Sequence, residues 1–330
     1  MQITPFVWIV TIVVMLAVLI ADAVLLARRP HVPGIRECLV FVALYVAAAI
    51  AFGLGLHIIS GPGPAGEFFA GWLTEYSLSL DNLFIFLIIM TKLKVPRRSQ
   101  QFALLVGIML ALVFRGVFIG LGAALIARLE WIFFVFGAWL IYTAVNLVRD
   151  HLRGSSEEEV DEAVGGPVMR WIQRAVPSTG DFREDRVFVR SNGKLLATSL
   201  FFVVVALGTT DVMFALDSIP AIYGLTQEPY IVFTANVFAL MGLRQLYFLL
   251  GDLLNRLVYL PLGLSVLLTF IGLKLIAHAG HHYGWDHHLG FDLDISTGIS
   301  LLVIVVILVS TTLASVIKMR ADARRERPVA

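Results

Sequence analysis

The chain alternates long apolar stretches with short polar segments. Nine stretches reach or approach the roughly 20 residues that a helix needs to cross bilayer hydrocarbon. They cover 5–27, 38–59, 67–91, 101–126, 131–149, 195–224, 230–250, 257–279 and 295–318. This pattern predicts an all-α fold, a polytopic membrane bundle of about nine transmembrane helices. Composition agrees, because 58% of the residues are hydrophobic and 15% are charged, whereas soluble domains carry about 25% charged residues.

The basic residues between the stretches predict the topology. If the amino terminus lies outside, the clusters at 28–36 and 92–98, the segment 149–194 and the Arg-rich tail all fall in the cytoplasm. The opposite loops 60–66, 225–229 and 280–294 contain no Lys or Arg, and 127–130 contains only Arg128. Basic residues accumulate on the cytoplasmic side of membrane proteins, so we expect an outside amino terminus and a cytoplasmic carboxyl terminus. The net charge of +1 gives no indication of nucleic-acid binding.

One long hydrophilic segment divides the chain. We expect an N-terminal membrane half of five helices (1–149), a cytoplasmic linker (150–194), a C-terminal half of four helices (195–318) and a basic tail (319–330). The favoured interpretation of 150–194 is a solvated linker. A short strand pair, with Trp171 and Phe182 on the membrane surface, is the alternative. A cytoplasmic partner at this segment and a homo-oligomer are both left open.

The two membrane halves contain similar sequences. Thr74-Glu75 and Leu80-Asp81 align with Thr210-Asp211 and Leu216-Asp217, and Arg115 aligns with Arg244. Spans three to five therefore repeat as spans six to eight, but they enter the membrane from opposite sides. Inverted repeats of this kind are common in secondary transporters, whose substrate site lies near the bilayer midplane.

The aligned segments place four carboxylates inside apolar sequence. Each charged side chain at the bilayer centre costs on the order of 2.5–3.5 kcal/mol, so a compensating cation or proton is expected. Neighbouring amide and hydroxyl groups complete a set of oxygen ligands of the kind that Mg²⁺, Ca²⁺ and Mn²⁺ prefer. The candidate metal ligands are Glu75, Asp81, Asn82, Asp211, Asp217 and Ser218.

Three intramembrane bases offer another interpretation of these acids. Arg115, Arg244 and Lys274 could form a permanent buried ion-pair network with them, or could gate the site and compensate its charge when the cation has left. Residues six apart on a helix are separated by roughly 120° and 9 Å, so the cavity must be wide or a helix must be interrupted. Pro220, three residues after Asp217, favours an interruption in span six.

A second candidate metal site lies in the loop predicted to be outside. It contains His281, His282, Asp286, His287 and His288, although such a composition is also ordinary at a membrane surface. The single cysteine, Cys38, is interpreted as a packing residue. The sequence contains no motif typical of an enzyme active site or of nucleotide binding, and we expect no permanently bound cofactor.

Four segments resemble the TerC family of integral membrane proteins. They are Glu75-Tyr-Ser-Leu-Ser-Leu-Asp81-Asn82-Leu-Phe-Ile-Phe, Thr210-Asp211-Val-Met-Phe-Ala-Leu-Asp217-Ser218-Ile-Pro220-Ala221-Ile, 232–250, and Phe270-Ile-Gly-Leu-Lys274. The resemblance covers roughly residues 5–318. It implies an exporter of Mn²⁺ in a bacterial inner membrane, of the lysine-exporter superfamily, with an indirect link to tellurium resistance. The chain departs from the family at Tyr76, where lysine is frequent, at Gly208, where glutamate is frequent, and in the His-rich loop.

Two other functions remain open on the sequence. The superfamily resemblance allows export of an organic cation or an amino acid. A membrane scaffold for stress-response proteins, acting through the linker, is a different class. Deleting residues 155–190 separates the classes, because a scaffold should lose its function while an exporter should keep part of it.

Overall fold

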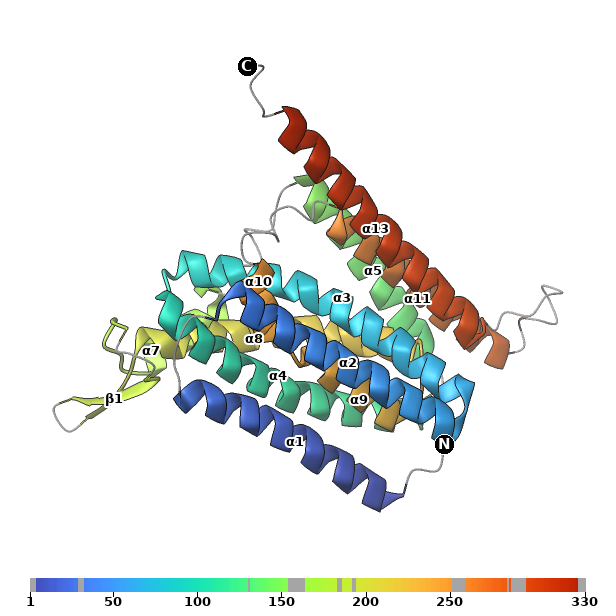
Figure 1. The fold of residues 1–330 in the computed structure, drawn as a ribbon, viewed down its shortest axis with the longest axis horizontal. Helices are drawn as coiled ribbons and strands as arrows, with labels where there is room; N and C mark the ends of the chain where they lie inside the picture. The colour runs from blue at the N-terminus through green and yellow to red at the C-terminus, as the bar shows by residue number, and fades with distance from the viewer. Residues whose placement is uncertain are drawn as a thin grey trace.

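The computed structural model describes residues 4–28, 33–129, 131–153, 164–182, 186–191, 194–250, 259–283, 285 and 295–325. The predicted all-α membrane bundle is confirmed (Figure 1). Its long helices are α1 (Pro5–Arg28), α2 (Ile35–Ser60), α3 (Pro62–Lys92), α4 (Arg97–Ile126), α5 (Ile132–Arg153), α8 (Ser199–Tyr223), α9 (Pro229–Leu240), α10 (Leu243–Leu250), α11 (Leu260–His282) and α13 (Thr297–Arg325).

The helices coincide with the predicted apolar stretches. Within the described ranges, 8 segments are long and apolar enough to cross a membrane, with α9 and α10 forming one of them. The first helix, α1, is apolar over Pro5–Ala21. Nine apolar stretches therefore correspond to eight full candidate spans and one shorter apolar helix.

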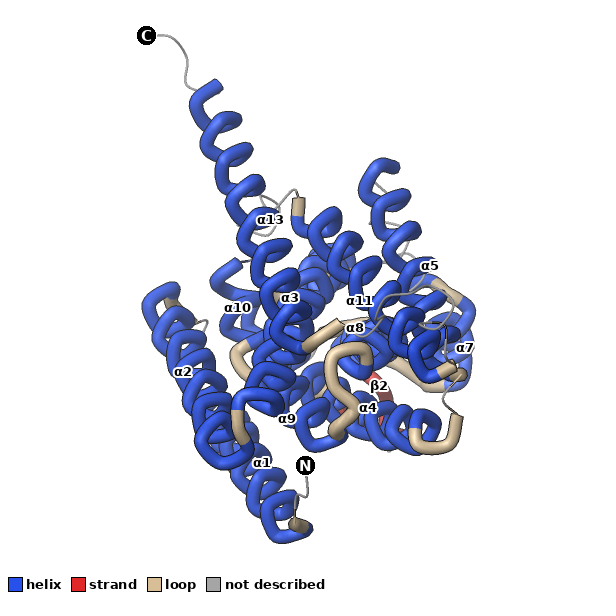
Figure 2. The backbone as a smooth tube through the Cα atoms, turned by 90° about the vertical axis from the view of Figure 1, so that its right-hand side faces the viewer, coloured by secondary structure: helices blue, strands red, loops and turns tan. Residues whose placement is uncertain are grey.

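Helix α3 lies at the centre of the bundle, where it packs against α2, α8, α9 and α13. Helix α4 packs against α8 and α9, and α5 packs most extensively against α11. Figures 1 and 2 show α5, α11 and α13 grouped on one side of the molecule, with α1 on the opposite side. Apolar side chains fill the space between these helices in three clusters, and the polar site lies among them.

Two glycines allow α5 and α11 to approach closely. A Cβ atom on Gly137 would lie 2.7 Å from the carbonyl oxygen of Gly272, and one on Gly272 would lie 2.8 Å from that of Gly137. Small residues permit such close contact between membrane helices. The two glycines occupy matching positions in the predicted repeats, and the α3–α9 and α4–α8 pairs match in the same way. The inverted relation itself remains a prediction.

The helix interruption is in span seven. Helix α8 continues through Pro220 to Tyr223, so the predicted interruption of span six is wrong. Pro220 lies in the last turn, where the loss of one backbone hydrogen bond no longer divides the helix. The break falls instead at Met241 and Gly242, between α9 and α10. Gly242 has φ 84°, a conformation that favours glycine.

The linker is partly structured, and it contains a short strand pair of the kind that the alternative interpretation predicted. It contains α7 (Pro167–Ala175) and an antiparallel hairpin of β1 (Phe188–Ser191) and β2 (Lys194–Ala197). Met169 of α7 is buried in the apolar cluster that includes α8. Figure 1 shows α7 and β1 together at one end of the bundle. Trp171, in contrast, is exposed.

Candidate functional site

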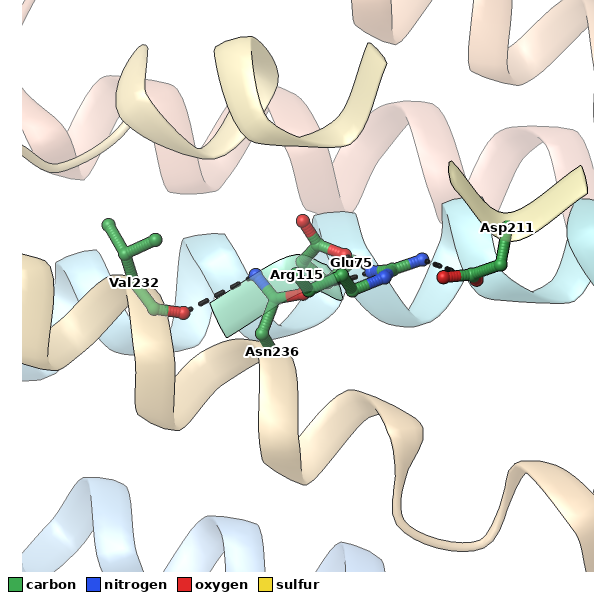
Figure 3. Close-up of polar contacts among 5 residues, drawn as sticks. All are labelled: Glu75, Arg115, Asp211, Val232 and Asn236. Carbon is green, nitrogen blue, oxygen red and sulfur yellow. Dashed lines mark hydrogen bonds and ion pairs between the residues drawn. The ribbon is translucent and has the colours of Figure 1, made fainter. Parts of the chain in front are cut away.

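A buried ion cluster joins four helices. Arg115 of α4 donates through Nη1 to Glu75 Oε2 of α3 at 2.5 Å and to Asn236 Oδ1 of α9 at 2.9 Å. Its Nη2 donates to Asp211 Oδ1 of α8 at 3.4 Å. Figure 3 shows the guanidinium group between these partners. The cluster therefore connects both predicted repeats through one arginine.

The ion cluster is isolated from solvent and unbalanced in charge. Glu75, Arg115 and Asp211 are 0%, 1% and 3% exposed. If all three side chains are ionised, two negative charges face one positive charge. A buried ion pair recovers its large desolvation cost only when geometry and further hydrogen bonds are favourable. In that state the cluster carries one uncompensated negative charge.

Several oxygen atoms of the two acidic segments are buried without a hydrogen-bond partner among the described residues. One carboxylate oxygen of each acid contacts Arg115, whereas the other oxygens, Glu75 Oε1 and Asp211 Oδ2, have no hydrogen-bond partner among the described residues. The hydroxyl oxygens of Thr74, Ser79 and Ser218 also have no such partner. All five atoms lie on α3 or α8, which pack against each other. Leaving a buried polar group unpaired costs about 1–3 kcal/mol, so each of these atoms would be stabilised by a hydrogen-bond donor or a cation placed beside it.

Asp217 occupies a second environment. Its Oδ1 accepts hydrogen bonds from Trp139 Nε1 at 2.7 Å and from Thr143 Oγ1 at 3.1 Å. Both donors lie on α5, so the contacts connect α8 to that helix. The carboxylate lines a cavity of about 400 Å³ between α3, α5, α8 and α11. Asp217 is therefore reachable from a cavity, whereas Glu75 and Asp211 are enclosed.

The cavity and the ion cluster are neighbours. Asn82 of α3 and Thr210 of α8 line the cavity, and the residue after Thr210 is Asp211 of the cluster. A cation in the cavity would thus meet Asn82 and Asp217 first, with the unpaired oxygen atoms on the same two helices. The side chain of Asp81, which precedes Asn82, lies outside the described part of the structure.

The other predicted residues are distributed over the bundle. Ser218 is buried on α8, and Lys274 is buried on α11. Arg244 lies on α10, just beyond the break at Gly242. Of the three predicted bases, Arg115 donates hydrogen bonds to two of the predicted acids, Glu75 and Asp211.

The outer loop is described only in part. His281 and His282 are exposed at the end of α11, whereas Asp286, His287 and His288 lie outside the described residues. Among the residues that the structure describes, no three His, Cys, Asp or Glu side chains are grouped for metal binding. The second metal site therefore stays a prediction.

Three residues of the site, Asn236, Trp139 and Thr143, were not predicted from the sequence. Asn236 is an amide inside an apolar helix, which is itself a signal of a buried polar contact. Trp139 and Thr143 carry no comparable signal, because both are common in membrane helices. Their spacing of four residues puts them on one face of α5, but only the packing of α8 shows that this face meets Asp217.

The space beside Gly208 is occupied by a side chain of the neighbouring helix. A Cβ atom there would lie 2.6 Å from Leu110 Cδ2 of α4. The space beside position 208 is therefore occupied by an apolar side chain. A ligand at this position, as suggested by the glutamate expected from the family resemblance, has no counterpart here.

The fold and these sites together define a multi-pass α-helical membrane protein with a buried charged site between its helices. Residues 60–323 match the integral membrane protein TerC family. The chain belongs to the TerC family, and the resemblance found in its sequence is confirmed.

Similar proteins come from bacteria and a plant. An uncharacterised membrane protein of Mycobacterium tuberculosis is 42% identical, over 96% of this chain and 81% of its own. The thylakoid membrane protein TERC of Arabidopsis thaliana is 39% identical, over 79% and 67%. The putative membrane-bound redox modulator Alx of Escherichia coli is 34% identical, over 84% and 88%. No solved structure matches the chain.

Proposed function

We propose that the chain is a secondary transporter that exports a divalent metal cation, foremost Mn²⁺, from the cytoplasm across a bacterial inner membrane. The observation that carries the proposal is the set of five buried oxygen atoms without partners on α3 and α8. Carboxylate and hydroxyl oxygens are ligands suited to Mn²⁺, Mg²⁺ and Ca²⁺. A cation bound between the unpaired carboxylate oxygens of Glu75 and Asp211 would offset the excess negative charge of the cluster.

The cavity would form the first part of a route to these ligands. Asp217 and Asn82 line it together, so the cation would bind to them before it reaches Glu75 and Asp211. Arg115 would then act as the counter-charge that holds the two enclosed acids while the cation is absent. Movement of the two repeats about the close contact of α5 and α11 would expose the site on the other side.

A role as a redox modulator, which the name of Alx describes, is less well supported for this chain. Cys38 is its only cysteine, so a single chain cannot form an intramolecular disulfide. A scaffold function would use the linker, but it would leave the buried oxygen donors unexplained. Transport accounts for both the donors and the cavity.

The test uses the purified full chain in lipid vesicles with Mn²⁺ outside and a Mn²⁺-quenched dye inside. We expect Mn²⁺ influx for the wild type, and a large loss for D217N and for E75Q, since an amide keeps the shape of the side chain but removes the charge. D181N changes an exposed acid of the linker and should transport normally. Absence of Mn²⁺ flux in the wild type, or normal flux in both D217N and E75Q, would refute the proposal.

A further inference from the structure

The cavity that reaches Asp217 is lined along α5 by polar side chains that the sequence analysis did not single out. Thr143, Asn146, Asp150 and His151 all face it. The first three are spaced by three and four residues, so they follow one face of the helix. These residues form a polar stripe along one side of a cavity whose other lining residues are largely apolar.

The stripe runs from the deep carboxylate to the end of the helix. Thr143 donates to Asp217 at 3.1 Å. Asp150 lies two turns further along α5, which is about 10 Å at 1.5 Å per residue. The helix ends at Arg153, on the side predicted to be cytoplasmic. Asp150 and His151 therefore stand at the mouth of the cavity, and Asp217 stands inside it.

The charges around the mouth favour a cation. Arg149, the neighbour of Asp150, lines a different groove between α5 and α11 with Leu152 and Thr269, and is not among the residues that line this cavity. Helix α11 lines the cavity with the apolar residues Pro261, Leu264 and Leu268. Polar lining residues on the other helices include Asn82 of α3 and Asp217 of α8. Among the described residues that line the cavity there is no Lys or Arg.

We infer that Asp150 and His151 form a recruiting site for divalent transition-metal cations at the mouth of this cavity. The carboxylate supplies charge, and the imidazole supplies a nitrogen ligand. Imidazole is a ligand of transition metals, whereas Mg²⁺ and Ca²⁺ are bound through oxygen. The nitrogen ligand would therefore disfavour Mg²⁺ and Ca²⁺ at the mouth, before any ion reaches the oxygen ligands deeper in the protein, which by themselves separate these ions from Mn²⁺ poorly.

Two protein ligands are few enough for the site to release its ion. Among the described residues, no three His, Cys, Asp or Glu side chains are grouped closely enough to bind one metal ion. Water molecules would therefore occupy the remaining coordination positions of an ion at the mouth. A fully coordinated ion would be trapped at the mouth. A site of this kind raises the local concentration of the ion and passes it on toward Asn146 and Thr143.

This inference rests on the proposed transport through the cavity, and the vesicle assay can test the two separately. For H151Q and D150N we expect a roughly tenfold rise in the Mn²⁺ concentration that gives half-maximal flux, at the low end of the losses seen when groups around a metal are changed. The maximal flux should stay close to that of the wild type. The control H57Q replaces an exposed histidine of α2 and should leave both values unchanged.

H151E gives a sharper comparison. It restores a ligand but makes the mouth all-oxygen, so Mn²⁺ flux should be kept while Mg²⁺ becomes a stronger competitor than for the wild type. Unchanged half-maximal concentrations in H151Q and D150N, with flux lost in D217N, would overturn the recruiting site and leave the proposed function intact. Normal flux in D217N and E75Q as well would overturn both.

Discussion

Removing Arg115 should destabilise the bundle more than any other single polar change in its centre. The variant R115M replaces the guanidinium group by an apolar side chain of similar length. It leaves Glu75 and Asp211 buried without their shared cation, and it takes a donor from Asn236. All four residues are at most 3% exposed, so water cannot replace the lost contacts.

The magnitude follows from that burial. Removing one partner of a buried ion pair costs about 3–5 kcal/mol, because the remaining charge is uncompensated. This corresponds to roughly a hundredfold to a few thousandfold change in the folding equilibrium. Replacing all charged members by neutral groups of similar volume is often close to neutral. The triple variant R115M/E75Q/D211N should therefore recover most of the loss.

The measurement is the free energy of unfolding in mixed detergent micelles, followed by circular dichroism as denaturing detergent is added. R170M, a change at an exposed arginine of α7, is the control and should differ little from the wild type. A loss below about 1 kcal/mol in R115M would contradict the cost expected for an unpaired buried charge. A triple variant no more stable than R115M would show that charge imbalance is not the cause.

Two further changes test the packing around the site. G137A should lose about 1–3 kcal/mol of unfolding free energy, because its Cβ atom would lie 2.7 Å from the backbone oxygen of Gly272, which cannot move without shifting its helix. The control G116A, which has nothing within 4 Å of the new atom, should keep the stability of the wild type in the same titration. Y223F should lower the free energy of unfolding by about 1 kcal/mol, because the Tyr223 hydroxyl donates to the carbonyl oxygen of Ile119 at 2.7 Å in the core. Y283F removes the hydroxyl of an exposed tyrosine, and equal stability of the two variants would count against this hydrogen bond.

The helices were predictable because the bilayer imposes a simple requirement. Each span must satisfy its backbone hydrogen bonds internally and present about 20 apolar residues to lipid. The predicted stretch 101–126 became α4, and 230–250 became α9 and α10. The break at Gly242 was missed because a glycine inside an apolar stretch is common, and its positive φ depends on packing beside Tyr45.

The candidate site was predictable in its residue types but not in its grouping. Four acids in apolar sequence had to be compensated, and the structure supplies Arg115 for two of them. The sequence could not tell which base would serve, since Arg115 and Arg244 occupy matching repeat positions. The spacing of six residues between Asp211 and Asp217 indicated that they cannot share one narrow face of a straight helix, but it did not show that they would lie in two different environments.

The amino-acid sequence by itself determined that this is a helical membrane protein of the TerC family and that carboxylates lie within its membrane-spanning segments. Hydrophobic length and local motifs carry that information along the chain. Only the tertiary structure decided that Glu75 and Asp211 share Arg115 in an enclosed cluster, while Asp217 faces a cavity with α5. The reason is physical, because charge compensation and access depend on which helix faces pack together, and that packing joins residues far apart in the sequence.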